Sequence, residues 1–386
     1  HRRTKGVKAL IAGAGIGGLA AGIALRQAGL DVQVFERSRE LREIGAGLMI
    51  WPNGTRSLQS LGVEIRALTV QQLSFCNWRG RQLLEVPMGA ISERYGSDVA
   101  FVHRAALQAA LARSFGRDGL RLGADVCGFE EDGAQVQLKL RDGTVAMGDL
   151  LVGADGLRSV VRRQLLGDGD PVYMGSTSWR GIVGSQGIAL ERGHGFNWVG
   201  RGSEFLAFHL ADDRIYWACV TKEAQGGKAG PGGHKQDVVE RFGNWAEPIP
   251  ALIAGTEEAA ILRSDIYDRP PARRWSQGRL TLVGDAAHPM TPNMGQGACQ
   301  ALEDAVALGD SLKSASDLSE AFELYERRRL RRANRVVAMS RQATRSVQID
   351  NPLLCRVRDG FASLLPRRVL LRMLDATLAA QPSGAS

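Results

Sequence analysis

Cysteine is scarce in this sequence of 386 residues, and the few that occur are far apart. None belongs to a CxxC pair or to a spacing typical of zinc ligands, and their number is odd. These features argue against a disulfide framework and against a structural zinc site, so we expect no metal site. Few and widely spaced cysteines also favour a reducing, cytoplasmic compartment. The five are Cys76, Cys127, Cys219, Cys299 and Cys355.

Long apolar runs are also missing. No stretch reaches the roughly 18 consecutive apolar residues of a membrane-spanning helix, so we expect no integral membrane segment. The apolar run at 7–12 gives way at once to glycines, unlike a signal peptide. The sequence also lacks HExxH, P-loop and nucleophile-elbow motifs, so it gives no sign of zinc-protease, phosphate-loop or serine-hydrolase chemistry.

The composition is that of a globular protein, with 44% hydrophobic and 23% charged residues. It excludes wholesale disorder. The net charge of +8 favours anionic ligands or surfaces. The basic stretch 327–332 lacks the interleaved aromatic residues typical of nucleic-acid binding, so we expect a solvated helix with some domain or dimer contacts and no nucleic-acid partner.

The chain begins with a pattern of strand, turn, helix and strand. The apolar run 7–12 predicts a buried strand, and the Ala- and Leu-rich segment 19–27 predicts a helix that Gly29 ends. The alternating DVQVFE at 31–36 predicts a second strand. This is the local context in which a glycine-rich turn binds a dinucleotide.

That turn carries the spacing Gly13-x-Gly15-x-x-Gly18. The first glycine permits the tight turn, the second lets a pyrophosphate approach the backbone, and the third lets the helix pack on the sheet. Glu36 ends the second strand, where an acidic side chain accepts hydrogen bonds from ribose hydroxyls. The pattern predicts dinucleotide binding and does not separate NAD from FAD.

Two further motifs follow predicted buried strands. Asp155-Gly156 comes after DLLVGA, and Gly284-Asp285 comes after RLTLV, with Gly295-Gln296-Gly297 beyond it. Ligands of open α/β sheets bind at the carboxyl ends of the strands, so an aspartate there is placed to accept from polyol hydroxyls. Backbone N–H groups at the following helix N-terminus are placed to stabilise a developing negative charge.

The rest of the sequence predicts further helices and strands that divide the chain into interleaved domains. We expect a helix over 103–115, a β-meander over 120–147, and a hairpin of strands 205–210 and 215–221. A helix is expected over about 297–312, and basic helical structure over 318–380. Because nucleotide-type strands occur at the start, in the middle and after an insert, the chain leaves one sheet and returns to it.

Three segments together resemble a known family. GAGIGGL, GADGLRSVVR and GRLTLVGDAAHPMTPNMGQGACQALEDA are similar to the motifs of single-component FAD-dependent aromatic hydroxylases, the group A flavoprotein monooxygenases with a p-hydroxybenzoate hydroxylase-like fold. Within that family the sequence looks closest to the salicylate, 3-hydroxybenzoate 6- and urate hydroxylase branch, which also resembles zeaxanthin epoxidase. The resemblance spans about 7–339, nearly the whole chain.

The resemblance implies an α/β fold in which a Rossmann-like FAD-binding domain is interleaved with a β-sheet substrate domain. The FAD-binding domain would comprise 1–70, 101–171 and 270–320. The substrate domain would comprise 71–100 and 172–269, and a C-terminal helical region would cover 321–386.

The resemblance also implies cofactor contacts by position. The glycine-rich turn would hold the FAD pyrophosphate, Glu36 the adenosine ribose with Arg37 beside it, and Val126 the adenine through its backbone. The remaining positions would surround the ribityl chain and the flavin ring. In chain order, the implied cofactor-binding residues are Gly13, Ala14, Gly15, Gly18, Glu36, Arg37, Ala46, Gly47, Arg104, Val126, Asp155, Gly284, Asp285, Pro292, Gly295, Gln296, Gly297 and Ala298.

The family's reaction uses NADH or NADPH and O₂, and transfers oxygen from a flavin C4a-hydroperoxide to an electron-rich ring. The resemblance therefore implies hydroxylation of a small aromatic or heteroaromatic substrate. An epoxidase or tailoring oxygenase with a larger lipophilic or polyketide substrate fits the same motifs. A flavin-free binding protein is a third class, against which the intact Asp285 and GQG loop argue. A monomer and a homodimer both stay open.

Substrate-facing residues should come from the inserted sheet. His209 stands among apolar residues of a predicted hairpin strand, and our hypothesis is that it faces the substrate as a hydrogen-bond partner or base. A satisfied core or surface histidine is the alternative. Arg180 is a candidate carboxylate clamp, although a structural role is favoured. Tyr216 and its neighbour Trp217 alternate in direction, so at most one points inward, and Pro292 would line the flavin.

Overall fold

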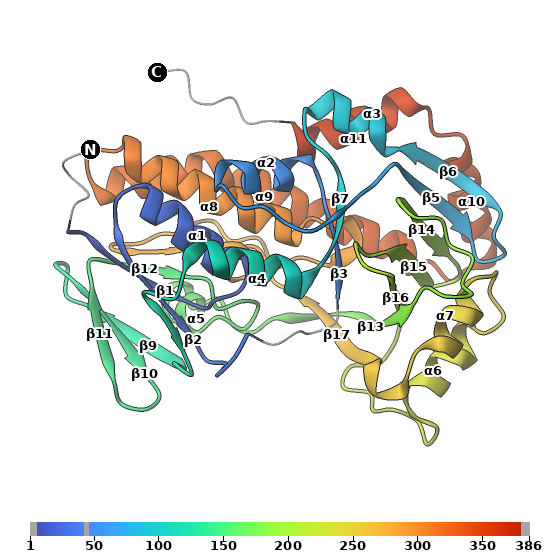
Figure 1. Cartoon of the computed structure of the whole chain (residues 1–386), viewed down its shortest axis with the longest axis horizontal. Helices are drawn as coiled ribbons and strands as arrows, with labels where there is room; N and C mark the ends of the chain where they lie inside the picture. Colours follow the sequence, from blue (N-terminus) through green and yellow to red (C-terminus); the bar gives the residue numbers. More distant parts are fainter. Residues whose placement is uncertain (1–5, 42–45, 380–386) are drawn as a thin grey trace.

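The computed structural model describes residues 6–41 and 46–379 (Figure 1). Three segments lie outside the described residues: 1–5, 42–45, which include the first two residues of IGAGLMIWPNG, and 380–386. The rest forms two large sheets, two small sheets and a set of covering helices.

A five-stranded sheet holds the three motifs. Its order is β18-β12-β1-β2-β8, and every neighbouring pair is parallel. Because all strands run the same way, their carboxyl ends meet at one edge, where the glycine-rich turn, Glu36, Asp155 and Asp285 follow directly. The strands are β1 (Lys8–Ala12), β2 (Asp31–Glu36), β8 (Leu120–Leu122), β12 (Leu150–Gly153) and β18 (Leu280–Leu282).

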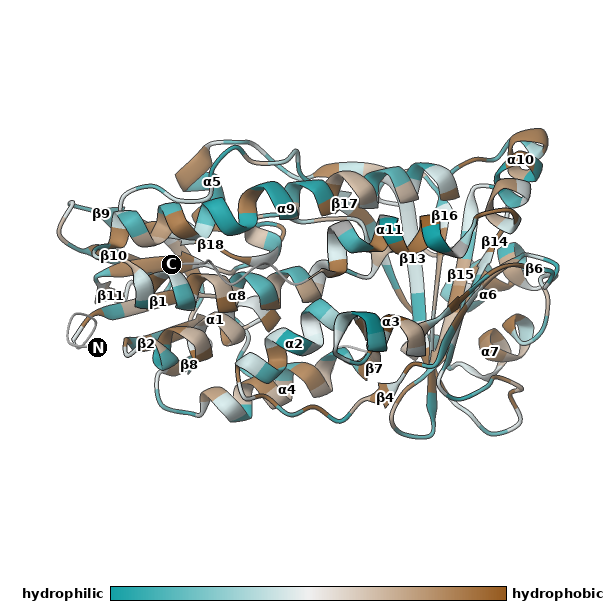
Figure 2. Cartoon of the chain, turned by 90° about the horizontal axis from the view of Figure 1, so that it is seen from above, coloured by the Kyte–Doolittle hydropathy of each residue, from teal (hydrophilic) through white to brown (hydrophobic). Residues whose placement is uncertain are grey.

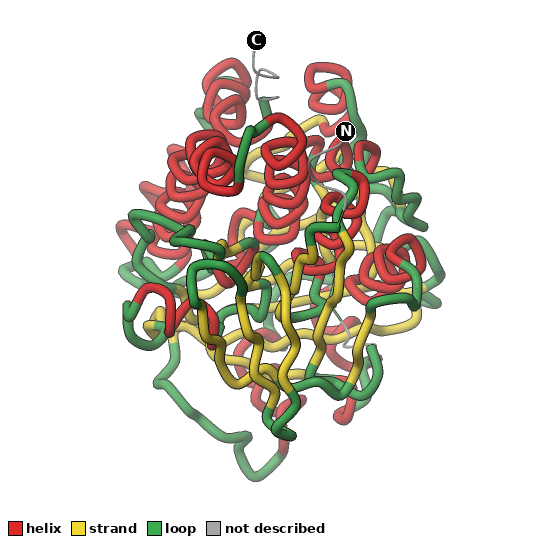
Figure 3. The backbone as a smooth tube through the Cα atoms, turned by 90° about the vertical axis from the view of Figure 1, so that its left-hand side faces the viewer, coloured by secondary structure: helices red, strands yellow, loops and turns green. Residues whose placement is uncertain are grey.

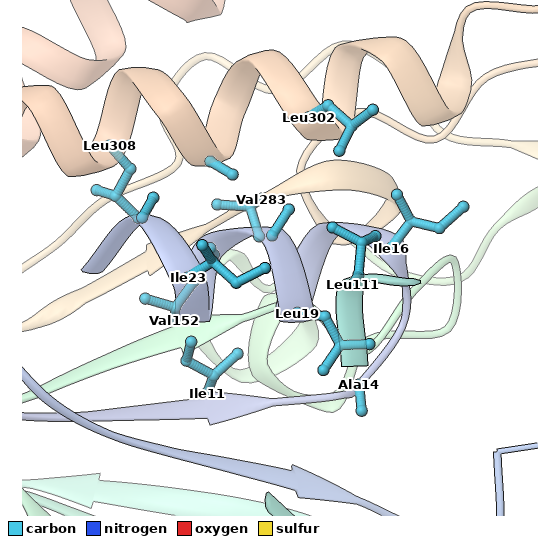
Figure 4. Close-up of a cluster of buried hydrophobic side chains, with 14 of the residues drawn as sticks. Ile11, Ala14, Ile16, Leu19, Ile23, Leu111, Val152, Val283, Leu302 and Leu308 are labelled. Carbon is cyan, nitrogen blue, oxygen red and sulfur yellow. The ribbon is translucent and has the colours of Figure 1, made fainter. Parts of the chain in front are cut away.

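Helices pack on this sheet through an apolar layer. Figure 4 shows side chains of β1, β12 and the β18 end, such as Ile11, Val152 and Val283, below the helical side chains Leu302 and Leu308. A Cβ on Gly309 would lie 2.9 Å from Ala24 Cβ, so that glycine lets two helices approach closely. The helices are α1 (Ile16–Gln27), α4 (Arg104–Phe115), α5 (Val160–Leu166) and α8 (Gly297–Ser314).

The second large sheet has seven strands in the order β17-β13-β16-β15-β14-β5-β6. One face, with Trp179, Phe205 and Trp217, packs under α6 and α7, and the other face, with Phe208 and Tyr216, joins the core of the parallel sheet. The strands are β5 (Gln72–Asn77), β6 (Gln82–Pro87), β13 (Val172–Gly184), β14 (His194–Val199), β15 (Ser203–His209), β16 (Arg214–Lys222) and β17 (Leu262–Asp268).

Smaller elements complete the chain, with the helices gathered beside the strands (Figure 3). The small antiparallel sheets have the orders β3-β7-β4 and β11-β10-β9. Their strands are β3 (Gly47–Ile50), β4 (Leu68–Thr69), β7 (Ala100–His103), β9 (Val126–Glu131), β10 (Val136–Leu140) and β11 (Val145–Gly148). The other helices are α2 (Pro52–Ser60), α3 (Met88–Tyr95), α6 (Gly233–Phe242), α7 (Ile249–Gly255), α9 (Leu318–Val347), α10 (Pro352–Ser363) and α11 (Arg367–Leu378), with 3₁₀ turns η1 (Glu258–Ala260), η2 (Gly284–Ala286) and η3 (Pro292–Met294).

The predicted α/β class and most predicted elements are confirmed, including the β15–β16 hairpin. The expected meander over 120–147 is partly wrong, because β8 joins the parallel sheet and only β9, β10 and β11 form the antiparallel unit. The seven-stranded sheet draws its strands from within 71–100 and 172–269. The division into domains remains our proposal.

A buried ion network joins α8 to α9. Arg329 of α9 is 1% exposed, and its Nε donates to Asp304 Oδ1 at 2.8 Å while its Nη1 donates to Glu303 Oε2 at 3.0 Å. Burial acts to raise the pKa of Asp304, but the charges of His288 and Arg329 outweigh it and lower that pKa. The pair is therefore charged and mutually dependent.

We expect Arg329→Met to lower the free energy of unfolding by about 3–5 kcal/mol, because it leaves two acids without their buried cation. Chemical denaturation measures this. The matched control is Arg327→Met, whose exposed i,i+4 pair with Glu323 should contribute at most about 1 kcal/mol. A loss for Arg329→Met no larger than the control's would contradict the network's role.

Candidate active site

The glycine-rich turn has two crowded glycines and one open one. Gly13 has φ +100°, and a Cβ there would lie 2.5 Å from the Ala154 carbonyl oxygen. A Cβ on Gly18 would lie 1.9 Å from the Gly13 carbonyl oxygen, whereas a Cβ on Gly15 would meet no atom within 4 Å. Gly13 and Gly18 are thus required by the fold, while Gly15 leaves open space at a helix N-terminus, which suits a pyrophosphate.

Glu36 lies beside this turn. Its Oε2 accepts from Ala14 N at 2.9 Å and its Oε1 from Ser38 N at 2.9 Å. Ala124 N donates to the Glu36 carbonyl oxygen at 2.8 Å, which brings the segment leading to Val126 alongside. Arg37 is exposed next to it. This is the arrangement expected where a ribose and an adenine bind at the end of β2.

Asp285 lies where three elements converge. Gly284 N donates to Asp304 Oδ2 at 2.9 Å, which fixes the turn that presents Asp285. Burial raises the pKa of Asp285, and the charges of His288 and then Arg104, at the start of α4, lower it. A Cβ on Gly297 would lie 3.9 Å from Asp285 Oδ1, so the first residue of α8 is close too.

The loop before α8 is fixed by hydrogen bonds to the side chain of Gln296. Gln296 Oε1 accepts from Asn53 Nδ2 at 3.0 Å and from Gln300 Nε2 at 3.1 Å. The first turn of α8, which includes Ala298, contains no acidic residue of its own, and the Asp285 carboxylate lies near its positive end. Gly295 has φ +59°, as a left-handed turn requires.

Asp155 is engaged within its own segment. Its Oδ2 accepts from Val160 N at 2.7 Å and from Val161 N at 3.2 Å, and its Oδ1 accepts from Ser159 Oγ. Its carboxylate thereby stabilises the start of α5. A contact of Asp155 with a cofactor remains a prediction.

The seven-stranded sheet contacts Gly47, a residue that we expect near the flavin. A Cβ there would lie 2.5 Å from Tyr216 Cδ1 and 2.8 Å from Phe208 Cε2. Phe208 also stacks on Phe101, with ring centroids 4.0 Å apart. Ala46, next to Gly47, accepts from Arg104 N through its carbonyl oxygen at 2.8 Å. The residues expected near the flavin therefore touch the face of the sheet that carries Tyr216.

Arg180 and Tyr216 share that face. Arg180 pairs in register with Ala218, two residues from Tyr216 along β16. The Arg180 Nε is buried and has no hydrogen-bond partner among the described residues. Burial raises the pKa of Tyr216 to about 12, although the charge of Arg180 acts to lower it. The tyrosine is thus a neutral hydrogen-bond donor at physiological pH.

The hypothesis for His209 needs correction. In β15 it pairs with Ile215 and lies on the same face as Phe205 and Ala207, which pack under α6 and α7. Its Nε2 donates to the Leu190 carbonyl oxygen at 2.8 Å, and burial lowers its pKa. The structure does not bring His209 to the face of Tyr216, because one residue along a strand reverses the side-chain direction.

Sequence reasoning missed Glu204. It is 4% exposed, and its Oε1 accepts from Asn293 Nδ2 while its Oε2 accepts from Asn197 Nδ2 at 3.5 Å. Burial raises the pKa of Glu204 to about 7. Asn293 follows Pro292 in the loop before α8, so this acid joins the sheet to the expected flavin loop. An acidic residue directly before the apolar run 205–208 was the available signal.

Comparison with known proteins agrees with this geometry. Residues 6–340 match the family model described as FAD binding domain. The chain is 41% identical to the aurachin C monooxygenase/isomerase of Stigmatella aurantiaca, over 93% of this chain and 94% of that protein. It is 33% identical to the FAD-dependent urate hydroxylase of Klebsiella pneumoniae, over 87% of this chain and 89% of that protein.

Solved structures show the same likeness. The crystal structure of Klebsiella pneumoniae HpxO complexed with FAD and uric acid superposes with a TM-score of 0.92 and 30% identity, covering 99% of each chain. A salicylate hydroxylase substrate complex, at 21% identity and a TM-score of 0.78, shares the fold; it covers 99% of this chain and 100% of that one. With the family match over nearly the whole length, the chain belongs to the FAD-binding domain family of the FAD-dependent aromatic hydroxylases.

Proposed function

We propose that this chain is an FAD-dependent monooxygenase that uses NADH or NADPH and O₂ to hydroxylate a small aromatic or heteroaromatic substrate. The observation that carries the proposal is the contact at Gly47. There the residues suited to hold FAD meet a sheet face with an unpartnered buried arginine nitrogen and a neutral tyrosine. Relatives named as aromatic or heteroaromatic oxygenases support the same substrate class.

The residues fit FAD along the edge of the parallel sheet. Gly15 leaves open space for the pyrophosphate, Glu36 suits the adenosine ribose, and Asp285 suits the ribityl chain. The N-terminus of α8 would stabilise negative charge on a reduced flavin ring. FAD, when bound, accepts hydride from the nicotinamide and activates O₂.

The chain's own side chains would bind and orient the substrate. Arg180 is suited to pair with a carboxylate or phenolate oxygen, and Tyr216 to donate a hydrogen bond to an oxygen or ring nitrogen. Glu204, with a pKa near neutrality, is suited to take a proton from a phenol or ring N–H. The stacked Phe101 and Phe208 exclude water beside them.

The visible spectrum of the purified protein, followed by NADH and NADPH oxidation in air, tests the proposal. The panel includes salicylate, 3-amino-4-hydroxybenzoate, urate and aurachin C. We expect flavin absorption bands and pyridine-nucleotide oxidation that accelerates only with certain compounds. A colourless protein that FAD does not reconstitute would overturn the proposal.

Gly15→Ala should lower FAD content strongly, because a methyl group would occupy the open space beside the turn. The flavin-free protein should unfold at an unchanged denaturant midpoint, since no protein atom lies within 4 Å of that Cβ. Gly184→Ala, which also enters open space but far from the turn, is the control. Unchanged FAD content in Gly15→Ala would show that the pyrophosphate binds elsewhere.

Arg180→Met should raise the substrate KM about tenfold or more, with FAD content unchanged, because a charge-assisted contact would be lost. Steady-state kinetics on the FAD-loaded enzyme measure this. Arg192→Met, at an exposed pair with Asp213, should leave KM as it is. A destabilised Arg180→Met enzyme with an unchanged KM would assign Arg180 a structural role instead.

Glu204→Gln should remove a pH-dependent instability. The folded pKa of about 7 lies above the unfolded value, so the folded state binds the extra proton and wild-type stability falls as pH rises from about 4.5 to 7. The variant should therefore gain on the order of 3 kcal/mol relative to wild type over that window. Chemical denaturation at several pH values measures the difference.

The same substitution should remove an inflection near neutrality from the pH profile of kcat/KM, if Glu204 accepts a substrate proton. Glu191→Gln, at an exposed position, is the control for both readouts. If the difference in unfolding free energy between Glu204→Gln and wild type does not vary with pH, the raised pKa of Glu204 is contradicted.

A further inference from the structure

Helix α10 carries its large apolar side chains on the outside. Its inner side is anchored by Cys355, which is buried with its Sγ donating to the Ile349 carbonyl oxygen at 3.2 Å, and by Arg358, whose Nη2 donates to the Gly200 carbonyl oxygen at 3.0 Å. The outward side chains are 54–81% exposed. These five, the α10 apolar stripe, are Leu353, Leu354, Val357, Phe361 and Leu364.

The spacing of the stripe places it on one face. Residues three or four apart lie on the same face of a helix, so 353, 357 and 361 form a row that Leu364, the C-cap of α10, continues, with 354 at its edge. The buried Cys355 lies on the opposite side. An ordinary surface helix buries its apolar row, and here the row faces water. In Figure 2, α10 lies at one end of the molecule, with hydrophobic segments at its outer side.

Three exposed arginines lie on α10 or on the helix that follows it along the chain. Arg356 of α10, and Arg368 and Arg372 of the adjoining α11, are exposed. Three acids close to these arginines already have a basic partner: Asp350 pairs with Lys222, Asp359 with Arg358, and Asp375 with Arg94. The three exposed arginines therefore place positive charge next to the apolar stripe.

From this combination we propose that the α10 apolar stripe is a membrane-contact surface that lies on an anionic lipid bilayer. Apolar side chains would enter the boundary between headgroups and acyl chains, while the arginines contact the lipid phosphates. Among the described residues no helix is long and apolar enough to cross a membrane, so the contact is interfacial.

A second copy of the chain fits the stripe less well than a bilayer does. A two-fold contact through α10 would bring the same arginines of both copies together, and like charges repel across an interface. Anionic headgroups supply the complementary charge. The charge pattern therefore favours lipid.

The surface lies beside the candidate active site. The charge of Arg358, on the inner side of α10, acts to lower the pKa of Glu204. A bilayer on the outer side of α10 would thus lie close to the substrate face of the seven-stranded sheet. Membrane contact through the α10 apolar stripe does not depend on which substrate the chain uses or on whether it is active.

Vesicle co-sedimentation of the full FAD-loaded chain tests the proposal. We expect binding to phosphatidylcholine vesicles that contain phosphatidylglycerol, at least about tenfold tighter than to phosphatidylcholine alone, and weakened by salt. The double variant Val357→Ser/Phe361→Ser should lose this binding while keeping its flavin spectrum and unfolding midpoint. Val239→Ser, on the exposed side of α6, is the matched control and should bind like wild type.

A charge variant separates the two contributions. Arg368→Ser/Arg372→Ser should remove the preference for phosphatidylglycerol and flatten the salt dependence. Absence of wild-type binding to anionic vesicles, or equal binding by the Val357→Ser/Phe361→Ser variant, would overturn the proposal. A wild-type dimer in sedimentation equilibrium that this variant dissociates would also overturn it, because the stripe would then join two copies.

Discussion

One buried carboxylate, Asp304 of α8, ties the candidate cofactor edge to the rest of the molecule. It accepts from the Gly284 N–H and from His288, and it pairs with Arg329 of α9. Because Asp304 accepts from the turn that presents Asp285, the position of that turn depends on the packing of α8 against α9. The charged state of Asp304 survives burial only through its cationic partners.

The site itself arises where two sheets meet. The carboxyl ends of the parallel strands gather the glycine-rich turn, Glu36 and Asp285 at one edge, as parallel topology requires. The seven-stranded sheet presents Tyr216 to Gly47, where no other residue type would fit. The Glu204–Asn293 contact adds a second connection between the sheet and the loop before α8. The residues that we propose for the cofactor and for the substrate are thereby in contact with one another.

Sequence reasoning succeeded where the constraint is local. Gly13 and Gly18 are dictated by atoms of their own turn and the adjoining strand end, and β2 forms over the predicted residues 31–36. It failed for His209, because both faces of β15 are buried and periodicity does not tell which face meets the other sheet. Glu204 was missed because its partner Asn293 lies 89 residues away, and the unpartnered Nε of Arg180 is visible only in three dimensions.

The most direct measurement of the central claim is the mass of the product formed under isotopically labelled O₂. The FAD-loaded enzyme would be supplied with NADH or NADPH and with whichever aromatic compound accelerates their oxidation. The account predicts a hydroxylated product that carries one labelled oxygen atom, since a monooxygenase transfers one atom of O₂ to its substrate. A product without label, or hydrogen peroxide as the only product with every compound, would contradict it.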